Sequence, residues 1–182
     1  DHCGGSIVRQ GSGFAPAFKN ATYWSNEHHW QWATKPNARE KASFLTENIL
    51  PIQESGQLKF VEIGRRSAEE NVYLHNILPN MDAFLVNGHT DAMMVPHIRY
   101  KGRTVAFMAD LLPSVHHIPL PWVMGYDTRP LLTLAEKSDF LGVAADEGIV
   151  LFFEHDATNQ CATVERTEKG IRLKETFPLS AL

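Results

Sequence analysis

The sequence predicts a mixed fold, α/β or α+β, in which helices pack on a sheet. Two observations in the second half of the chain support this prediction. Residues 130–145 carry apolar side chains at helical spacing over a typical helix length, while short apolar runs typical of strands lie on both sides of them. Residues 149–153 are apolar throughout, as expected of a strand buried on both faces. Such alternation of strand and helix excludes an all-helical or all-β domain.

The first third of the chain is expected to be mainly helical after its glycine-rich opening. Ser25 is a candidate N-cap for a short aromatic helix over residues 26–33. Pro36 suits the first position of a second helix, whose apolar side chains recur at helical spacing over residues 38–49. Residues 58–63 alternate in polarity and predict a strand.

The remaining strands are expected in short apolar or alternating runs with turn signals between them. They cover residues 83–87, 93–100, 103–109, 162–167 and 171–177. Lys101-Gly102 and Lys169-Gly170 are suited to the turns of two hairpins. We find no internal repeat and no long linker, so we predict a single domain over residues 1–182.

Composition and charge exclude several classes of protein. The chain has 182 residues, of which 43% are hydrophobic and 21% charged, and its net charge is −4. Nucleic-acid binding would need a strongly basic surface, so no such partner is expected. No apolar run reaches the roughly 18 residues that a membrane span requires. Two cysteines cannot form a disulfide framework, which favours a reducing compartment and hence a cytoplasmic location.

A repeated pattern joins apolar strands to potential metal ligands. Residues 83–87 lead into His89, residues 104–109 lead into Asp110, and residues 149–154 lead into His155. A strand end is held rigidly by its sheet, while the side chain that follows can face a cleft. The opening Asp1-His2 adds a second pairing of carboxylate and imidazole. We therefore expect these side chains to converge on one site.

Hydrolysis at a metal centre is the chemistry that suits this set of side chains. Imidazole and carboxylate ligands favour Zn²⁺, with Mn²⁺ or Fe²⁺ as alternatives where oxygen donors dominate. An aspartate can bridge two such ions through its two oxygens, and two ions about 3.5–4 Å apart can hold a hydroxide for attack on a carbonyl. These ligands lie far apart in the sequence and form no local motif, so folding must bring them together.

Other candidate groups have simpler structural explanations. A histidine outside the pattern more often faces water or packs in the core than binds metal. This interpretation applies to His28, His29, His75, His97, His116 and His117, of which His117 follows Asp110 closely enough to line a substrate site. Asp91 and Asp156 are explained as turn residues, and Cys3 as a small buried side chain.

The motifs together resemble the metallo-β-lactamase-fold hydrolases. Asp1-His2-Cys3-Gly4-Gly5 is similar to the end of the His-x-His-x-Asp-His motif of that superfamily, and Gly88-His89-Thr90 resembles its third histidine motif. Asp110 resembles the bridging aspartate, and His155 the final histidine. The aromatic segment 18–44 is similar to the lactonase-like branch. The order of the motifs agrees from Asp1 to about Asp156.

The resemblance implies an αβ/βα sandwich with two divalent ions at one edge. In that arrangement His89 would bind the first ion, Asp110 would bridge, and the second ion would be bound by Asp1, His2 and His155. Two further histidines would precede Asp1, in a segment or separate chain that ends in His-x-His-x. We therefore expect the chain to be incomplete and to lack the N-terminal β-layer of the fold.

The loop after Asp110 indicates the class of substrate. Residues 111–126 are apolar and stiffened by proline, so Leu120, Trp122 and Met124 are expected to line the cleft beside His117. An apolar wall favours an acyl or aromatic group over a phosphodiester. Tyr126 could donate a hydrogen bond to a developing oxyanion, or could simply pack over the following helix.

These inferences predict a metallohydrolase that acts on a small molecule. A metal-bridged hydroxide would attack an ester, lactone or amide carbonyl, with lactone or ester preferred and dinuclear zinc as the expected cofactor. Asp1 and Tyr126 are the candidate catalytic residues. A thioesterase of the glyoxalase II kind or a β-lactamase is the alternative among enzymes. A non-catalytic metal-binding scaffold is the alternative of another class.

Overall fold

The structure is a computed structural model that describes residues 1–64 and 72–182. They form two compact units: residues 2–64 make up one, and Asp1 with the described residues from 72 onward makes up the other. The single domain predicted over residues 1–182 stays a prediction. Within the described residues, no helix is both long and apolar enough to cross a lipid bilayer.

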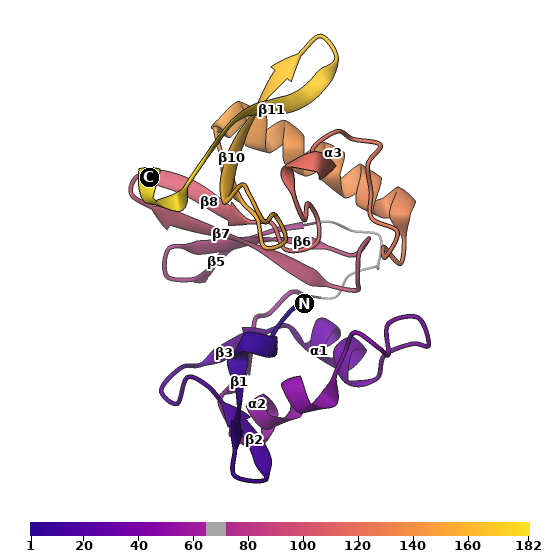
Figure 1. Cartoon of the computed structure of the whole chain (residues 1–182), viewed down its shortest axis with the longest axis vertical. Coiled ribbons are helices and arrows are strands. Elements are labelled where there is room, and N and C mark those ends of the chain that lie inside the picture. Colours follow the sequence, from indigo (N-terminus) through magenta and orange to yellow (C-terminus); the bar gives the residue numbers. More distant parts are fainter. Residues whose placement is uncertain (65–71) are drawn as a thin grey trace. The chain divides into compact units, whose positions relative to one another are not determined.

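The N-terminal unit combines two small sheets with short helices (Figure 1). Its elements are η1 (Gly4–Ser6), β1 (Ile7–Gln10), β2 (Gly13–Pro16), β3 (Tyr23–Ser25), α1 (Glu27–Thr34), η2 (Thr46–Asn48), α2 (Leu50–Glu54) and β4 (Leu58–Phe60). Strands β1 and β2 form an antiparallel hairpin, and β3 pairs in parallel with β4. The prediction of a mainly helical first third is therefore wrong. In place of a helix, residues 7–16 form the β1–β2 hairpin, whose turn contains Gly11 with a positive φ of 60°.

The helix predicted over residues 38–49 is also wrong, apart from the short η2 at its end. The reason is local side-chain chemistry. The side-chain oxygen of Asn37 accepts hydrogen bonds from the main-chain amides of Arg39 and Glu40, which closes a turn in place of a helix. Glu40 then accepts the indole hydrogen of Trp32 at 2.8 Å. The predicted aromatic helix is present as α1, but Asn26 rather than Ser25 caps it, by accepting from the His29 amide at 2.8 Å.

The larger unit is built on a sheet of seven strands in the order β11-β10-β9-β8-β7-β6-β5. Its elements are β5 (Val72–Leu78), β6 (Met81–Val86), β7 (Met93–Tyr100), β8 (Arg103–Phe107), η3 (Val115–His117), α3 (Pro130–Glu147), β9 (Val150–Phe152), β10 (Cys161–Thr167), β11 (Gly170–Phe177) and η4 (Leu179–Ala181). Neighbouring strands are antiparallel except β8 and β9, which are parallel. The sequence prediction placed every strand here except β5.

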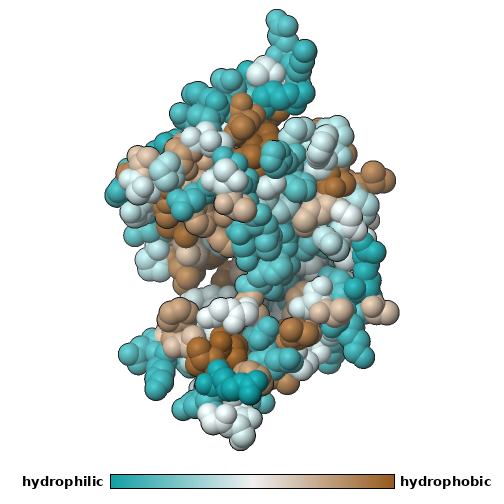
Figure 2. All heavy atoms as spheres, viewed as in Figure 1, coloured by the Kyte–Doolittle hydropathy of each residue, from teal (hydrophilic) through white to brown (hydrophobic). Residues whose placement is uncertain are grey.

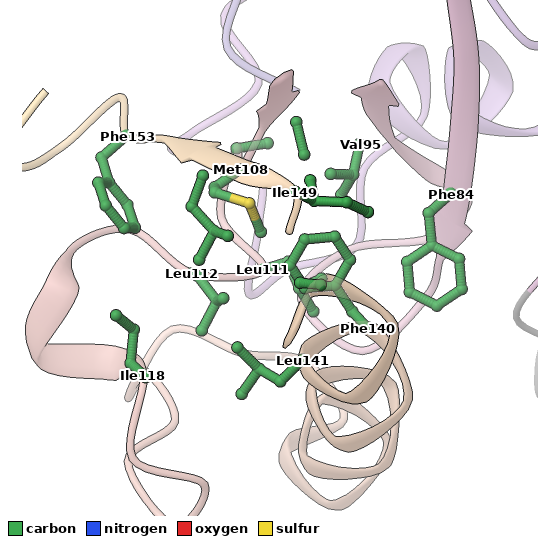
Figure 3. Close-up of a cluster of buried hydrophobic side chains, with 14 of the residues drawn as sticks. Phe84, Val95, Met108, Leu111, Leu112, Ile118, Phe140, Leu141, Ile149 and Phe153 are labelled. Atoms are coloured by element: carbon green, nitrogen blue, oxygen red, sulfur yellow. The ribbon is translucent and has the colours of Figure 1, made fainter. Parts of the chain in front are cut away.

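Helix α3 packs against one face of this sheet and closes the core (Figure 1). Pro130 occupies its first turn, and Gly148 ends it in the left-handed conformation that a C-terminal cap favours. Figure 3 shows Phe140 and Leu141 of α3 among side chains from the sheet and from the segment after Asp110. That segment contributes Leu111, Leu112 and Ile118 to the core, so the loop has a buried base.

The open edge at β11 is protected by charge. The tip of the β10–β11 hairpin is hydrophilic, as the upper end of Figure 2 shows. On this edge strand Arg172 is partly buried, and the side chains of Lys174 and Glu175 are exposed. Charged side chains on an edge strand oppose pairing with other chains.

His97 is the group in this core that makes the fold sensitive to acid. It lies on β7 with 4% of its surface exposed, between the rings of Tyr73 and Phe140 at centroid distances of 5.6 and 5.7 Å. Burial lowers the pKa of His97 to about 4, against the opposing effect of Asp82. The folded protein therefore holds His97 neutral under conditions in which the unfolded chain protonates it.

Because the pKa of His97 is depressed on folding, we expect the free energy of unfolding to decrease as the pH is lowered from 6.5 to 4. The contribution of this residue is on the order of 3 kcal/mol. His97→Gln removes the titrating group and should flatten this part of the profile, as measured by urea unfolding at a series of pH values. The exposed His75→Gln is the matched control. Equal pH slopes for wild type and His97→Gln would contradict the prediction.

Candidate metal centre

Strand direction brings three of the predicted site residues to one edge of the sheet. Strands β6, β8 and β9 run in the same direction, since β7 is antiparallel to both β6 and β8 and since β8 is parallel to β9. His89, Asp110 and His155 each follow the last residue of one of these strands by three positions. Carboxyl ends of strands that share a direction lie at the same sheet edge, where ligand sites commonly form.

The carboxylate of Asp110 lies between two histidines. Its Oδ2 is 3.3 Å from Nε2 of His89, and its Oδ1 is 3.3 Å from Nε2 of His155. The side chain of Asp110 is 6% exposed, whereas that of His155 is 43% exposed. Ala109, directly before it, has a positive φ of 45°, a conformation that costs a non-glycine residue energy and often occurs at functional sites. The two carboxylate oxygens thus face two different imidazoles.

Asp1, His89 and Asp110 form a group of three potential metal ligands. Its Oδ2 lies 3.3 Å from Nε2 of His89. One potential ligand atom from each of Asp1, His89 and Asp110 lies within 4.8 Å of the other two. The spacing of these donors matches what a small divalent cation requires.

Asp127 orients the imidazole of His89 from its other side. The Asp127 Oδ1 lies 3.0 Å from Nδ1 of His89, and the aspartate is 4% exposed. A proton on Nδ1 is donated to this carboxylate, which leaves the lone pair of Nε2 facing the carboxylates of Asp1 and Asp110. Three acceptors that meet in this way repel one another unless a cation lies among them. The donor set therefore fits a divalent metal ion, and a carboxylate behind a ligand histidine is typical of such sites.

Sequence reasoning missed Asp127. It lies 38 residues from His89 and belongs to no motif, and it follows the exposed Tyr126 in an irregular segment. A histidine ligand needs a partner for its second nitrogen, but only the fold selects Asp127 among the acidic residues.

The loop that carries His89 is held by the first half of α3. A Cβ atom added to Gly88 would lie 2.3 Å from the main-chain nitrogen of Thr133, so no larger residue fits at this crossing. The main-chain amide of Arg129 donates to the Gly88 carbonyl at 2.8 Å, and its guanidinium donates to the carbonyl of Asn87. The same guanidinium forms an ion pair with Asp91 at 3.1 Å.

Glu136 binds the same loop from within the core. Its side chain is fully buried, and its two oxygens accept the main-chain amides of Asn87 at 2.6 Å and Gly88 at 3.0 Å. Burial raises the pKa of Glu136 to about 7, although the two amides and Arg129 oppose that shift. The position of His89 is therefore set by contacts that lie one and two residues before it.

The other predicted site residues of the loop after Asp110 are either half-buried or exposed. Leu120 and Met124 are half-buried, as is His117, whose Nδ1 lies 3.0 Å from Oγ of Ser114. Burial, followed by the nearby charge of Lys137, lowers the pKa of His117. Trp122 and Tyr126 are 64% and 79% exposed. His2 belongs to the N-terminal unit. The roles assigned to these residues stay predictions.

Asp156 and Cys3, which the sequence explained as a turn residue and as a small buried side chain, make contacts with main-chain groups in the structure. Asp156 closes a turn by accepting the amides of Thr158 and Asn159, and it also accepts the Val115 amide at 3.1 Å. Burial would raise the pKa of Asp156, but these hydrogen bonds lower it to about 2. Cys3 is half-buried, and its thiol donates to the carbonyl of Asn48.

Comparison with known proteins identifies the fold. No family model and no curated protein matches the chain. Among solved structures, a probable metal-dependent hydrolase from Staphylococcus aureus is 21% identical and superposes with a TM-score of 0.71, over 90% of this chain. The hydrolase AbOPH of the beta-lactamase superfamily is 16% identical, with a TM-score of 0.67 over 87% of this chain.

A lactonase has the same fold. AidC, described as a dizinc quorum-quenching lactonase in complex with the product N-hexanoyl-homoserine, is 20% identical and superposes with a TM-score of 0.65 over 98% of this chain. The chain spans 56% of the length of the first two proteins and 62% of AidC. The chain thus has the metallo-β-lactamase fold over the part that it shares with them. The fold predicted from the sequence resemblance is confirmed.

The contact between Asp127 and His89 predicts an effect on metal affinity. Asp127→Asn retains the size of the side chain but removes the charge that orients Nδ1, so the affinity for Zn²⁺ should fall ten- to a hundredfold. Competition with a chromophoric chelator measures this change without reference to activity. Asp139→Asn, at an exposed position on α3, is the control. An unchanged zinc affinity for Asp127→Asn would remove the positioning role.

The crossing of Gly88 and Thr133 predicts opposite effects for two glycine substitutions. Gly88→Ala places a methyl group inside the van der Waals radius of α3 main chain, and we expect a loss of about 3 kcal/mol in the free energy of unfolding. Gly142→Ala, on the same helix, meets Arg166 only at 3.5 Å and should be neutral or stabilising by up to about 1 kcal/mol. Chemical unfolding followed by circular dichroism compares them. Equal stability for both variants would show that the loop moves aside.

Proposed function

We propose that this chain belongs to a metal-dependent hydrolase that uses two divalent ions, zinc in the first place, to hydrolyse a carboxylic ester or lactone. The observation that carries the proposal is the position of Asp110, which presents one oxygen to His89 and the other to His155. A carboxylate shared in this way is the ligand that two neighbouring cations require. The fold shared with hydrolases supports the same assignment.

The residues of this chain have distinct roles in the proposal. The resemblance assigned Asp1 to the second ion, but its distance from His89 favours the first. His89, Asp110 and Asp1 would then hold one ion, and Asp110 with His155 would contribute to the second. Ions bound there would supply Lewis acidity for the hydrolysis of a carbonyl compound. Asp127 keeps Nε2 of His89 directed to the site. Tyr126 is the candidate donor to the oxygen of the carbonyl, and its exposure leaves the hydroxyl accessible to a substrate.

The loop after Asp110 supports a substrate with an apolar part. Its core-facing side chains fasten it to the fold, while Trp122 remains exposed and Leu120 and Met124 remain half-exposed. These side chains suit an acyl group better than a charged phosphodiester. The lactonase AidC binds a product that carries such a group. A lactone or ester of an apolar acid is therefore the substrate class that we propose.

Two substitutions test the assignment of roles. Asp110→Asn removes the charge that two cations share, so we expect the rate of ester or lactone hydrolysis to fall by at least about a thousandfold. His117→Ala removes only a lining side chain and should lower the rate by about tenfold or less. The measurement compares kcat/KM for both variants, with zinc content determined alongside. Equal losses would show that the roles are wrongly assigned.

A substrate panel with metal analysis tests the function itself. The purified protein, loaded with zinc, would be assayed on lactones, aryl esters, a thioester and a β-lactam. Turnover of the lactones or esters with bound metal supports the proposal. Preference for the thioester or the β-lactam would replace the substrate class. Bound metal without turnover of any of these compounds would favour a metal-binding scaffold.

A further inference from the structure

A second buried charge on α3 holds the loop that follows Asp110. Lys137 is fully buried, and its Nζ donates to the carbonyl oxygens of Pro119 at 3.3 Å, Leu120 at 3.2 Å and Trp122 at 2.7 Å. An ammonium group has three hydrogens, and here three main-chain carbonyls accept them. Burial lowers the pKa of Lys137 to about 8, and the neighbouring Asp127 opposes that shift.

The loop is also fixed at its other points. It begins at Asp110 and ends at Asp127, and both of these carboxylates contact His89. The amide of Val115, near its first turn, donates to Asp156, which follows His155. Between residues 118 and 123 the described hydrogen bonds are those from Lys137 and short main-chain bonds within the loop itself, such as the one from the Trp122 amide to the Pro119 carbonyl at 3.0 Å. Lys137 is thus the side chain that ties the middle of the loop to α3.

The part of the loop that Lys137 holds carries exposed aromatic and apolar side chains. Trp122 accepts the shortest of the three hydrogen bonds through its carbonyl, while 64% of its surface is exposed. Tyr126, four residues later, is 79% exposed. Ordering a main chain costs conformational entropy. A segment whose side chains stay in solvent gains little burial in return, so stability alone does not explain why this segment is held. A rigid loop with exposed aromatic side chains is suited to contact with a ligand.

A structural role alone explains this lysine poorly. Moving an ammonium group from water into the interior has a large desolvation cost, and an apolar side chain of similar volume often serves stability as well or better. What the ammonium adds is geometry, because it defines where three carbonyls must lie. An apolar residue would instead leave those carbonyls to find other partners.

We propose that Lys137 is a positioning residue that fixes residues 119–122 and so determines which acyl groups the site selects. The inference rests on the proposed hydrolase function and extends it to the selection of substrate. In this role Lys137 touches neither the metal ligands nor the substrate. It acts through Trp122, whose main chain it holds and whose exposed side chain would meet the apolar part of the substrate.

Lys137→Met tests the proposal, because methionine has a similar volume and no charge. In the metal-loaded protein, hydrogen exchange of the amides of Leu120 and of residues 122–124 should accelerate by at least about tenfold. The KM for a decanoyl lactone should rise by about tenfold, while the KM for the butanoyl analogue, kcat and zinc content stay within about twofold. Lys174→Met, at an exposed position on β11, is the matched control.

Trp122→Ala keeps the proposal testable if Lys137→Met does not fold. It should reduce the selectivity for decanoyl over butanoyl by a similar factor, with the main-chain hydrogen bonds to Lys137 intact. The double variant should lose no more selectivity than either single variant, because both changes remove the same contact between Trp122 and the substrate. Retained selectivity in Trp122→Ala, or in folded Lys137→Met, would overturn the inference.

The outcome separates this inference from the function on which it rests. If the wild-type protein turns over neither lactone, the proposed function fails and the role in selection fails with it. If the wild type turns over both lactones and the variants keep its selectivity, only the role of Lys137 is removed. Faster exchange in Lys137→Met with unchanged selectivity also overturns the inference, since it shows a purely structural anchor.

Discussion

The close approach of Gly88 to Thr133 is the constraint on which the site depends. It lets α3 cross the loop after β6 with main chain against main chain, at a distance that no side chain larger than hydrogen allows. This crossing brings Arg129 and Glu136 within hydrogen-bond reach of the residues before His89. Because α3 also packs across the core face of the sheet, the position of His89 is coupled to the packing of the whole unit.

Two adjacent charged residues of α3 fasten two different loops. Glu136 accepts main-chain amides from the His89 loop, and Lys137 donates to main-chain carbonyls of the loop after Asp110. Both side chains are fully buried, and both bind main chain. A bond to main chain defines the path of a loop without restricting which side chains the loop presents. The helix can therefore hold the site rigid while the loop side chains determine what binds there.

Negative charge at the site has a physical consequence for its cofactor. Asp1, Asp110 and Asp127 surround one imidazole, with Arg129 satisfied elsewhere by Asp91 and the carbonyl of Asn87. Carboxylates in such proximity repel one another, and a divalent cation relieves that repulsion. Metal binding should thus stabilise the fold, because the unfolded chain offers no such group of donors.

The sequence by itself determined the strands of the larger unit except β5, and it predicted three residues that the structure brings to one edge of the sheet. The residue pattern of a buried strand is local in the sequence. His89, Asp110 and His155 each lie just beyond such a strand, so the sequence alone could indicate them as candidates. Local polar contacts already escape this reasoning. The turn made by Asn37 replaced a predicted helix, because a side-chain oxygen took the amides that a helix would have used.

Only the tertiary structure decided which distant groups meet. Asp127 reaches His89 across 38 residues, and Lys137 meets the carbonyls of a loop 15 to 18 residues earlier in the chain. No periodicity encodes these contacts, since an aspartate or a lysine in a sequence is most often a solvated surface group. Burial and the direction of main-chain groups select these residues, and both arise when α3 packs on the sheet.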